Sequence, residues 1–120
     1  MAEHPDNWVV IKITPEETLN SSNTAYIKTD PFYKVLAGWS GGYLGGDMWK
    51  LNSGIVQVKE EENSYHFIGQ SGNEYVCDKS QYKLRMNTAG IWKQIQEAAE
   101  SSGNIKIELM PEDTKWGNIL

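Results

Sequence analysis

The residue types best suited to ligand binding or chemistry gather in one glycine-rich segment, Gly38–Trp49, which holds five of the eleven glycines and two of the five tryptophans. Within it, Trp39, Tyr43 and Trp49 could stack on a base, a sugar ring or a partner's side chain. Asp47 is its one acid, so a carboxylate-based site would be centred there. The plainer interpretation is structural: the glycines mark turns and bulges, the tryptophans fold into the core, and Asp47 accepts hydrogen bonds from turn amides.

The glycine-rich segment does not match a phosphate-binding loop. It contains neither Gly-Lys-Ser/Thr nor Gly-x-Gly-x-x-Gly, and no helix is expected directly after it. Nucleotide binding through such a loop is therefore not expected, and the aromatic side chains stand as the candidate ligand contacts.

Reactive and metal-binding side chains are scarce elsewhere. The single cysteine, Cys77, cannot form an internal disulfide. Strand alternation places Cys77 on a buried face and His66 on the opposite one, so a thiolate–imidazole pair is not expected and Cys77 is interpreted as a small core residue. The other histidine, His4, lies in a terminus expected to be mobile. Because no ligand spacing is recognisable, we expect neither a metal nor another cofactor.

The only local basic cluster comprises Lys79, Lys83, Arg85 and Lys93. Because aromatic residues lie nearby, this cluster could contact an acidic partner or a nucleic-acid strand. The plainer interpretation is a solvated connection followed by a helix face with snorkelling side chains. The acids Glu60–Glu62 are expected at a hairpin tip, where they keep the tip soluble and block edge pairing.

Composition narrows the function classes further. At 120 residues, 39% of them hydrophobic, the chain is expected to form a single domain, 1–120, with a real core. Its formal charge of −5 provides no basis for non-specific binding to nucleic acid or anionic lipid. No apolar run is long enough to span a membrane, and Met1–Asp6 lacks the layout of a signal peptide. We therefore expect a cytoplasmic protein without membrane contact.

The elements that must position these residues are mainly strands. Residues 8–13 predict a strand whose two faces are both covered, and residues 25–29 and 32–37 predict two more. Thr14–Glu17 has the pattern of a helix start, with Thr as the N-cap and Pro in the first helical position, so a single helical turn is expected there.

A three-stranded meander over residues 55–78 is the clearest pattern. Its first turn is expected around Glu61 and Glu62, and its second over Gln70–Gly72, with Gly72 left-handed. The first turn opposes Val58 with Tyr65 and Val56 with Phe67, and the second opposes Phe67 with Tyr75 and Tyr65 with Cys77. Both registers place all six of these side chains on one buried face.

A helix and a strand follow the meander. The helix is predicted over residues 88–102, capped by Asn87-Thr88 and ended by Gly103. A strand is expected near 104–110. The tail, 111–120, contains Trp116 and is too apolar for a frayed end, so we expect it to dock on this domain or on a copy of it. The apolar stripe of the helix consists of Ile91, Trp92, Ile95, Ala98 and Ala99.

Together these elements predict an α+β fold: a mostly antiparallel bent sheet or small barrel with one main helix and a C-terminal strand. The runs Asp47–Ile55 and Gly69–Tyr75 have the character of a small bacterial or phage domain. The first functional hypothesis is a non-catalytic binding or regulatory module that acts through protein–protein contacts, with a second copy of the chain as one candidate partner. The alternatives are a binder of small ligands, carbohydrate or single-stranded nucleic acid through residues 38–49, and a small enzyme with a carboxylate site near Asp47.

Overall fold

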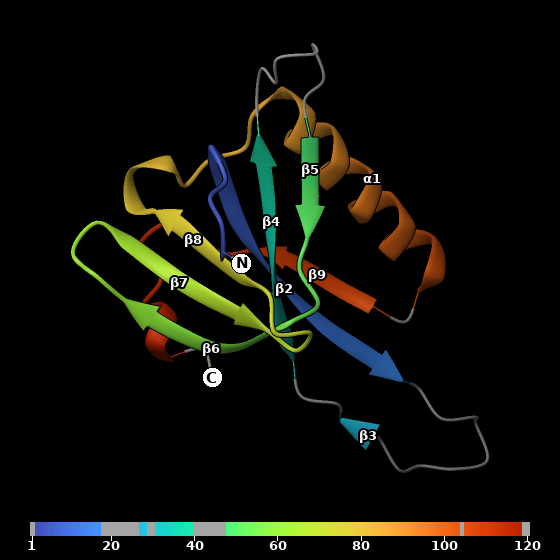
Figure 1. Cartoon of the computed structure of the whole chain (residues 1–120). Coiled ribbons are helices and arrows are strands. Elements are labelled where there is room, and N and C mark those ends of the chain that lie inside the picture. Colours follow the sequence, from blue (N-terminus) through green and yellow to red (C-terminus); the bar gives the residue numbers. More distant parts are fainter. Residues whose placement is uncertain (1, 18–26, 29–30, 40–47, 104, 119–120) are drawn as a thin grey trace.

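Two mainly antiparallel sheets and one long helix make up the described part of the chain (Figure 1). The computed structural model describes residues 2–17, 27–28, 31–39, 48–103 and 105–118. The predicted α+β class is confirmed. The sheets do not close on each other, so the barrel alternative is wrong.

The larger sheet is built around its longest strand, β2. On one side β2 pairs with β4, which in turn pairs with β5, and on the other side it pairs with β9; all of these pairs are antiparallel. The short β3 pairs with the end of β2 and falls within the strand predicted over 25–29. The strand bounds are Asn7–Glu17 (β2), Ile27–Lys28 (β3), Phe32–Trp39 (β4), Met48–Leu51 (β5) and Ile105–Leu109 (β9).

The smaller sheet has the strand order β1-β8-β7-β6. Strands β6, β7 and β8 form the predicted meander, and β1 adds to β8 in parallel. The strand bounds are Ala2–Glu3 (β1), Ile55–Glu60 (β6), Ser64–Gly69 (β7) and Glu74–Asp78 (β8).

The two faces of β2 serve two separate cores. Trp8 and Val10 pack into an aromatic core with residues of the smaller sheet, whereas Val9 and Ile11 pack under the helix α1 (Met86–Ser102). All four side chains are at most 2% exposed. The prediction that both faces of this strand are covered is confirmed, and the larger sheet is the middle layer of the fold.

Strand β2 runs on past Ile13, so the helical turn predicted at Thr14–Glu17 is wrong. Its later residues pair with β9, a tertiary contact that outweighs the local capping signal. Pro15 is tolerated because successive residues of a strand direct their backbone groups to alternate neighbours. Met110 N donates to Val10 O on the β9 side, so the odd-numbered residues of β2, including Pro15, direct their backbone groups towards the β4 side. The β2–β4 pairing ends at Ile13, so β4 has no residue opposite Pro15.

The second register of the meander is confirmed. Phe67 lies opposite Tyr75, and Tyr65 lies opposite Cys77. Gly72 has φ 90°, the left-handed conformation that the three-residue turn requires.

The first register of the meander is shifted by two residues from the prediction. Val58 lies opposite Phe67 instead of Tyr65. The cause is the turn: Glu61 N donates to Ser64 O over 2.8 Å, so the turn is centred one residue later than expected. Because side chains alternate with a period of two, the shift leaves Val58 and Tyr65 on the core face.

Val56 is the exception on that face, and its predicted burial is wrong. Its side chain is 51% exposed, whereas the preceding Ile55 is only 6% exposed. A bulge between Ile55 and Gln57 reverses the alternation at this point.

The helix α1 starts at Met86, two residues before the predicted start, with Arg85 as the N-cap residue. Thr88 still takes part in the cap, because its Oγ1 accepts a hydrogen bond from Arg85 N at 2.9 Å. Gly103 ends the helix with φ 70°, as predicted. Of the predicted stripe, Ala98 is exposed, while the other four residues pack towards the sheet or are buried.

Candidate functional site

The glycine-rich segment 38–49 is described only at its two ends. Trp39 closes β4, and Trp49 lies in β5, which had not been predicted as a strand. The two strands pair as a hairpin, with Gly38 opposite Trp49 and Trp39 opposite Met48. Tyr43 and Asp47, two of the predicted site residues, lie outside the described residues.

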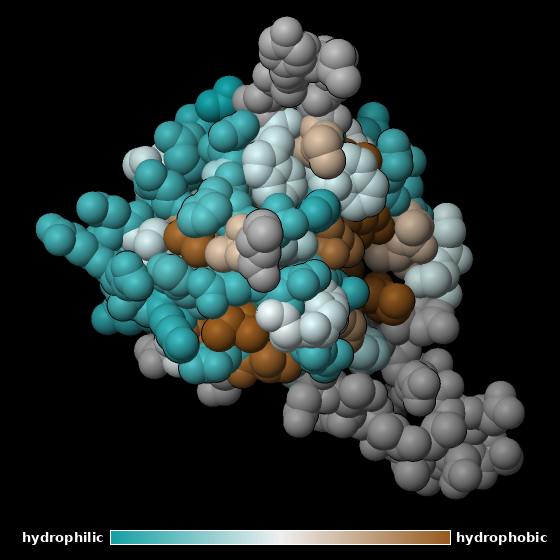
Figure 2. Space-filling view, in the orientation of Figure 1, coloured by the Kyte–Doolittle hydropathy of each residue, from teal (hydrophilic) through white to brown (hydrophobic). Residues whose placement is uncertain are grey.

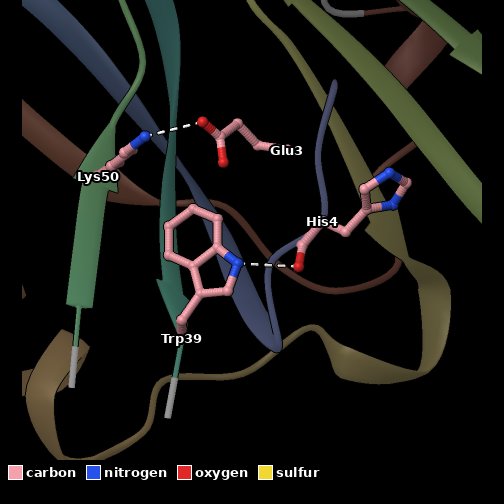
Figure 3. Close-up of polar contacts among 4 residues, drawn as sticks. All are labelled: Glu3, His4, Trp39 and Lys50. Carbon is pink, nitrogen blue, oxygen red and sulfur yellow. Dashed lines mark hydrogen bonds and ion pairs between the residues drawn. The ribbon is translucent and has the colours of Figure 1, made fainter. Parts of the chain in front are cut away.

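Trp39 is held by the N-terminal segment (Figure 3). Its indole Nε1 donates to His4 O at 2.9 Å, and Lys50 Nζ lies 5.9 Å from the ring centroid. Lys50 also forms an ion pair with Glu3 Oε1 at 2.8 Å, which raises the pKa of the lysine. Both the N–H and one face of the indole are therefore engaged within the chain.

The same contacts correct the expectation of a mobile terminus around His4. Ala2 and Glu3 pair with β8, and Asp6 N donates to Gly38 O at 2.9 Å. The segment before β2 therefore connects the edge of the smaller sheet to the end of the β4–β5 hairpin.

Trp116 is part of the aromatic core. It is 1% exposed, and its ring centroid lies 5.9 Å from that of Trp8 and 6.0 Å from that of Phe67. It begins a short 3-10 turn, Trp116–Asn118. Its side chain therefore offers no surface for a ligand.

Among the predicted aromatic site residues that the structure describes, Trp49 is the most accessible. Its side chain is 45% exposed, and that of its neighbour Met48 is 57% exposed. The two side chains point to opposite faces of β5, because successive residues of a strand alternate. Within the described residues, β5 ends the order β3-β2-β4-β5, so its outer edge has no strand partner.

The start of α1 lies beside the same strand. Asn87 Nδ2 donates to Met48 O at 3.1 Å, and the preceding Met86 is 91% exposed. We refer to Met48, Trp49 and Met86 as the β5 corner. Figure 2 shows white-to-brown side chains over β5 and beside the helix, where they interrupt a mostly teal surface. Neither methionine was predicted as a site residue, although the adjacent bulky side chains of Met48 and Trp49 would have been the signal.

The edges formed by β1, β6 and β9 carry features that discourage pairing. β1 is only two residues long. β6 has its bulge after Ile55 and ends in Lys59-Glu60, and β9 presents the exposed charges of Lys106 and Glu108. By contrast, the single charge on β5, Lys50, is already paired with Glu3.

The predicted basic cluster is partly neutralised by acids. Lys79 Nζ lies 2.7 Å from Glu60 Oε2 and 4.9 Å from the centroid of the Tyr65 ring, and the hydrogen bond to Glu60 raises the pKa of the lysine. Arg85 lines a shallow, open pocket together with two acids, Asp6 and Asp78. Lys83 and Lys93 are exposed, the latter on α1.

Cys77 and His66 lie on opposite faces of the meander, as predicted. Cys77 is fully buried, and burial strongly raises the pKa of its thiol, so it is not a nucleophile at neutral pH. His66 instead contacts two carboxylates, Glu74 at 2.9 Å and Glu61 at 3.2 Å. In the described part of the chain, no group of three or more His, Cys, Asp or Glu side chains is arranged to hold a metal ion.

A second open hollow lies where the C-terminal segment meets the meander. Its acids are Glu60, Glu112 and Asp113, and its aromatic lining comes from Tyr65 and Trp116. Glu60 is already engaged by a lysine, and Trp116 is buried, so this hollow offers a ligand less contact surface than the β5 corner.

Comparisons with family models, with curated proteins and with solved structures found no match to this chain. Among the described residues, no helix is both long enough and apolar enough to cross a bilayer.

Proposed function

We propose that this protein is a non-catalytic binding module that engages a protein partner through the β5 corner. The observation that carries the proposal is the combination of a strand edge without a partner among the described strands and two large, exposed side chains, Met48 and Trp49. Met and Trp are enriched at interface cores, and Trp is among the residues that dominate binding energy. A cytoplasmic location, expected from the sequence, is part of this proposal.

Trp39 supports a protein partner over a small flat ligand. A stacking platform needs free aromatic faces, and Trp39 has Lys50 over its ring and His4 O on its indole nitrogen. The binder of sugars or single-stranded nucleic acid is therefore the second candidate. Fluorescence titration with sugars, nucleotides and oligonucleotides tests it, since a ligand stacked on Trp49 would quench that indole.

A displayed library of random peptides provides a probe for the protein-binding proposal. Peptides are selected on the whole chain, and their affinities are measured by fluorescence polarisation. We expect Trp49→Lys to weaken the selected peptides by about tenfold or more, because a buried interface Trp is a typical hot spot. Val56→Lys is the matched control, since Val56 is 51% exposed on the edge strand of the other sheet.

Two results would contradict the proposal. One is equal binding to the wild type and to Trp49→Lys, with both proteins equally stable in urea. The other is loss of binding in Val56→Lys but not in Trp49→Lys. Light scattering on the same proteins shows whether the partner is a second copy, because Trp49→Lys would then convert a dimer into a monomer. Removing the tail is a poorer test, since it deletes Trp116 from the core.

A further inference from the structure

The outer edge of β5 presents a row of backbone hydrogen-bonding groups that no other described strand pairs with. Asn52 N donates to Val35 O at 3.0 Å. This bond shows which alternate residues of β5 direct their backbone groups towards β4. Because successive residues alternate, Met48 and Lys50 direct their backbone groups towards β4, whereas Trp49 and Leu51 direct theirs outwards. Within the described residues, no strand pairs with these outward groups.

We infer that the partner contributes an extended segment that adds to β5 as a further strand, with a carboxylate opposite Lys50 and apolar residues on either side of it. This inference rests on the proposed function and specifies its partner. The outward N–H and C=O groups of Trp49 and Leu51 supply main-chain hydrogen bonds, and the alternating side chains supply specificity.

Charge complementarity selects the acidic residue. Lys50 is the only charged residue of β5, it lies between Trp49 and Leu51, and 45% of its side chain is exposed. In the free protein its ammonium group is held by Glu3 Oε1 at 2.8 Å. An ammonium group has three donors, so an arriving carboxylate on the same face can share Lys50 with Glu3.

A second copy of the chain is a poorer partner for the outer edge of β5 than an acidic extended segment. In an antiparallel pair about a two-fold axis, outward-facing residues must meet outward-facing residues. Joining Trp49 to Leu51 of the second copy places the two Lys50 side chains directly opposite each other, and like charges in that position are destabilising. Joining the two Trp49 residues, or the two Leu51 residues, keeps only one pair of hydrogen bonds within β5.

Backbone methylation of a selected peptide tests the added strand. Each peptide variant carries one N-methyl group and therefore lacks one N–H donor. If the peptide lies along β5, affinity falls at every second position and is unchanged at the positions between, because alternate residues bond to the strand. Equal sensitivity at all positions, or none, would overturn strand addition, while the Trp49→Lys result would still decide the proposed function.

A charge swap tests the partner's acidic residue. The double variant Glu3→Lys with Lys50→Glu keeps the intramolecular ion pair with its polarity reversed, so its fold is preserved more securely than in either single variant. Replacing the peptide's central acid by its amide is expected to weaken binding to the wild type by about two- to fivefold, and to strengthen binding to the swapped protein. New selections on the swapped protein should return Lys or Arg at that position.

An unchanged preference for acid on the swapped protein would overturn the assignment of Lys50. So would a wild-type selection that returns no acid at the central position. If the swapped protein is less stable in urea, Glu3→Gln is the second variant, because it frees Lys50 and should raise affinity for the acidic peptide without changing β5.

Discussion

Asn7 and Thr88 are hydrogen-bonded to each other in the protein interior, with Asn7 Nδ2 donating to Thr88 Oγ1 over 2.9 Å. Their side chains are 1% and 0% exposed. The same hydroxyl oxygen accepts from Arg85 N, so one atom links β2 to the first turn of α1. This link fixes the end of the helix that lies beside the β5 corner.

Thr88→Val should therefore destabilise the protein by about 1–3 kcal/mol, because it leaves buried donors without their acceptor while keeping the shape of the side chain. Urea unfolding measures the change. Thr114→Val is the matched control: its Oγ1 donates to Pro111 O in an exposed turn, where water can replace the bond. Equal effects of the two substitutions would show that the Asn7–Thr88 bond contributes little.

Gly38 lies against the same pair of side chains. A Cβ atom added there would be 2.7 Å from Asn7 Oδ1 and 2.7 Å from Thr88 Cγ2. Gly38→Ala is expected to cost about 1–3 kcal/mol through overpacking. Gly90→Ala, in the exposed part of α1 with no atom within 4 Å, should instead stabilise by about 0.5–1 kcal/mol. Thermal unfolding of the two variants should shift in opposite directions, and a shift of both in the same direction would contradict the close packing of Gly38 against Asn7 and Thr88.

The partly buried Tyr82 makes stability depend on alkaline pH. Its Oη donates to Met110 O and accepts from Val10 N at 3.3 Å, and burial raises its pKa from 10.0 to about 12. Between these values the unfolded chain binds fewer protons than the folded one, so the free energy of unfolding falls as pH rises from 10 to 12. Below pH 10 this contribution is fully present.

Tyr82→Phe should remove that part of the pH dependence, although it loses about 0.5–1.5 kcal/mol at neutral pH with the hydrogen bonds. Urea unfolding at a series of pH values measures both effects. The buried Cys77 thiol, whose pKa burial also raises, destabilises both proteins alike above its ordinary value of 9.0, so their difference isolates Tyr82. A constant difference between the two proteins up to pH 12 would argue against the shift.

Two tryptophans should behave oppositely on truncation. Trp116→Ala removes a side chain that is 1% exposed and is expected to cost about 3–5 kcal/mol. Trp49→Ala, at a position 45% exposed, should cost about 1 kcal/mol or less. Acrylamide quenching adds an independent measurement, since Trp49 contributes an accessible indole and Trp116 does not. Equal losses of stability would contradict their placement.

Local patterns predicted the elements whose determinants are close in sequence. The second turn of the meander follows from Gly72 and the alternation around it, and the end of α1 follows from Gly103. The error of two residues in the first register came from Glu61–Asn63, where no glycine marks the turn centre. The bulge beside Val56 leaves no local signal either, because it reverses an alternation that looks regular in sequence.

Long-range pairing accounts for the remaining differences. The residues from Thr14 onwards have the sequence pattern of a helix start, but pairing with the distant strand β9 makes this segment extended. Sequence pattern alone named Trp49, which is exposed, as a candidate contact residue. However, Met86 joins the same corner through the Asn87–Met48 contact, a tertiary relationship that spacing along the chain does not encode.

Because β2 belongs to two cores, neither core can close during synthesis until its last segment has been translated. β9 holds the last-translated described residues of the helix-side core, and Trp116 is the last-translated described residue of the aromatic core. Until they leave the ribosome, a nascent chain exposes the unclosed faces of β2 to the cell. Chaperones should therefore meet this protein through Trp8 and its neighbours, a surface that no finished molecule displays.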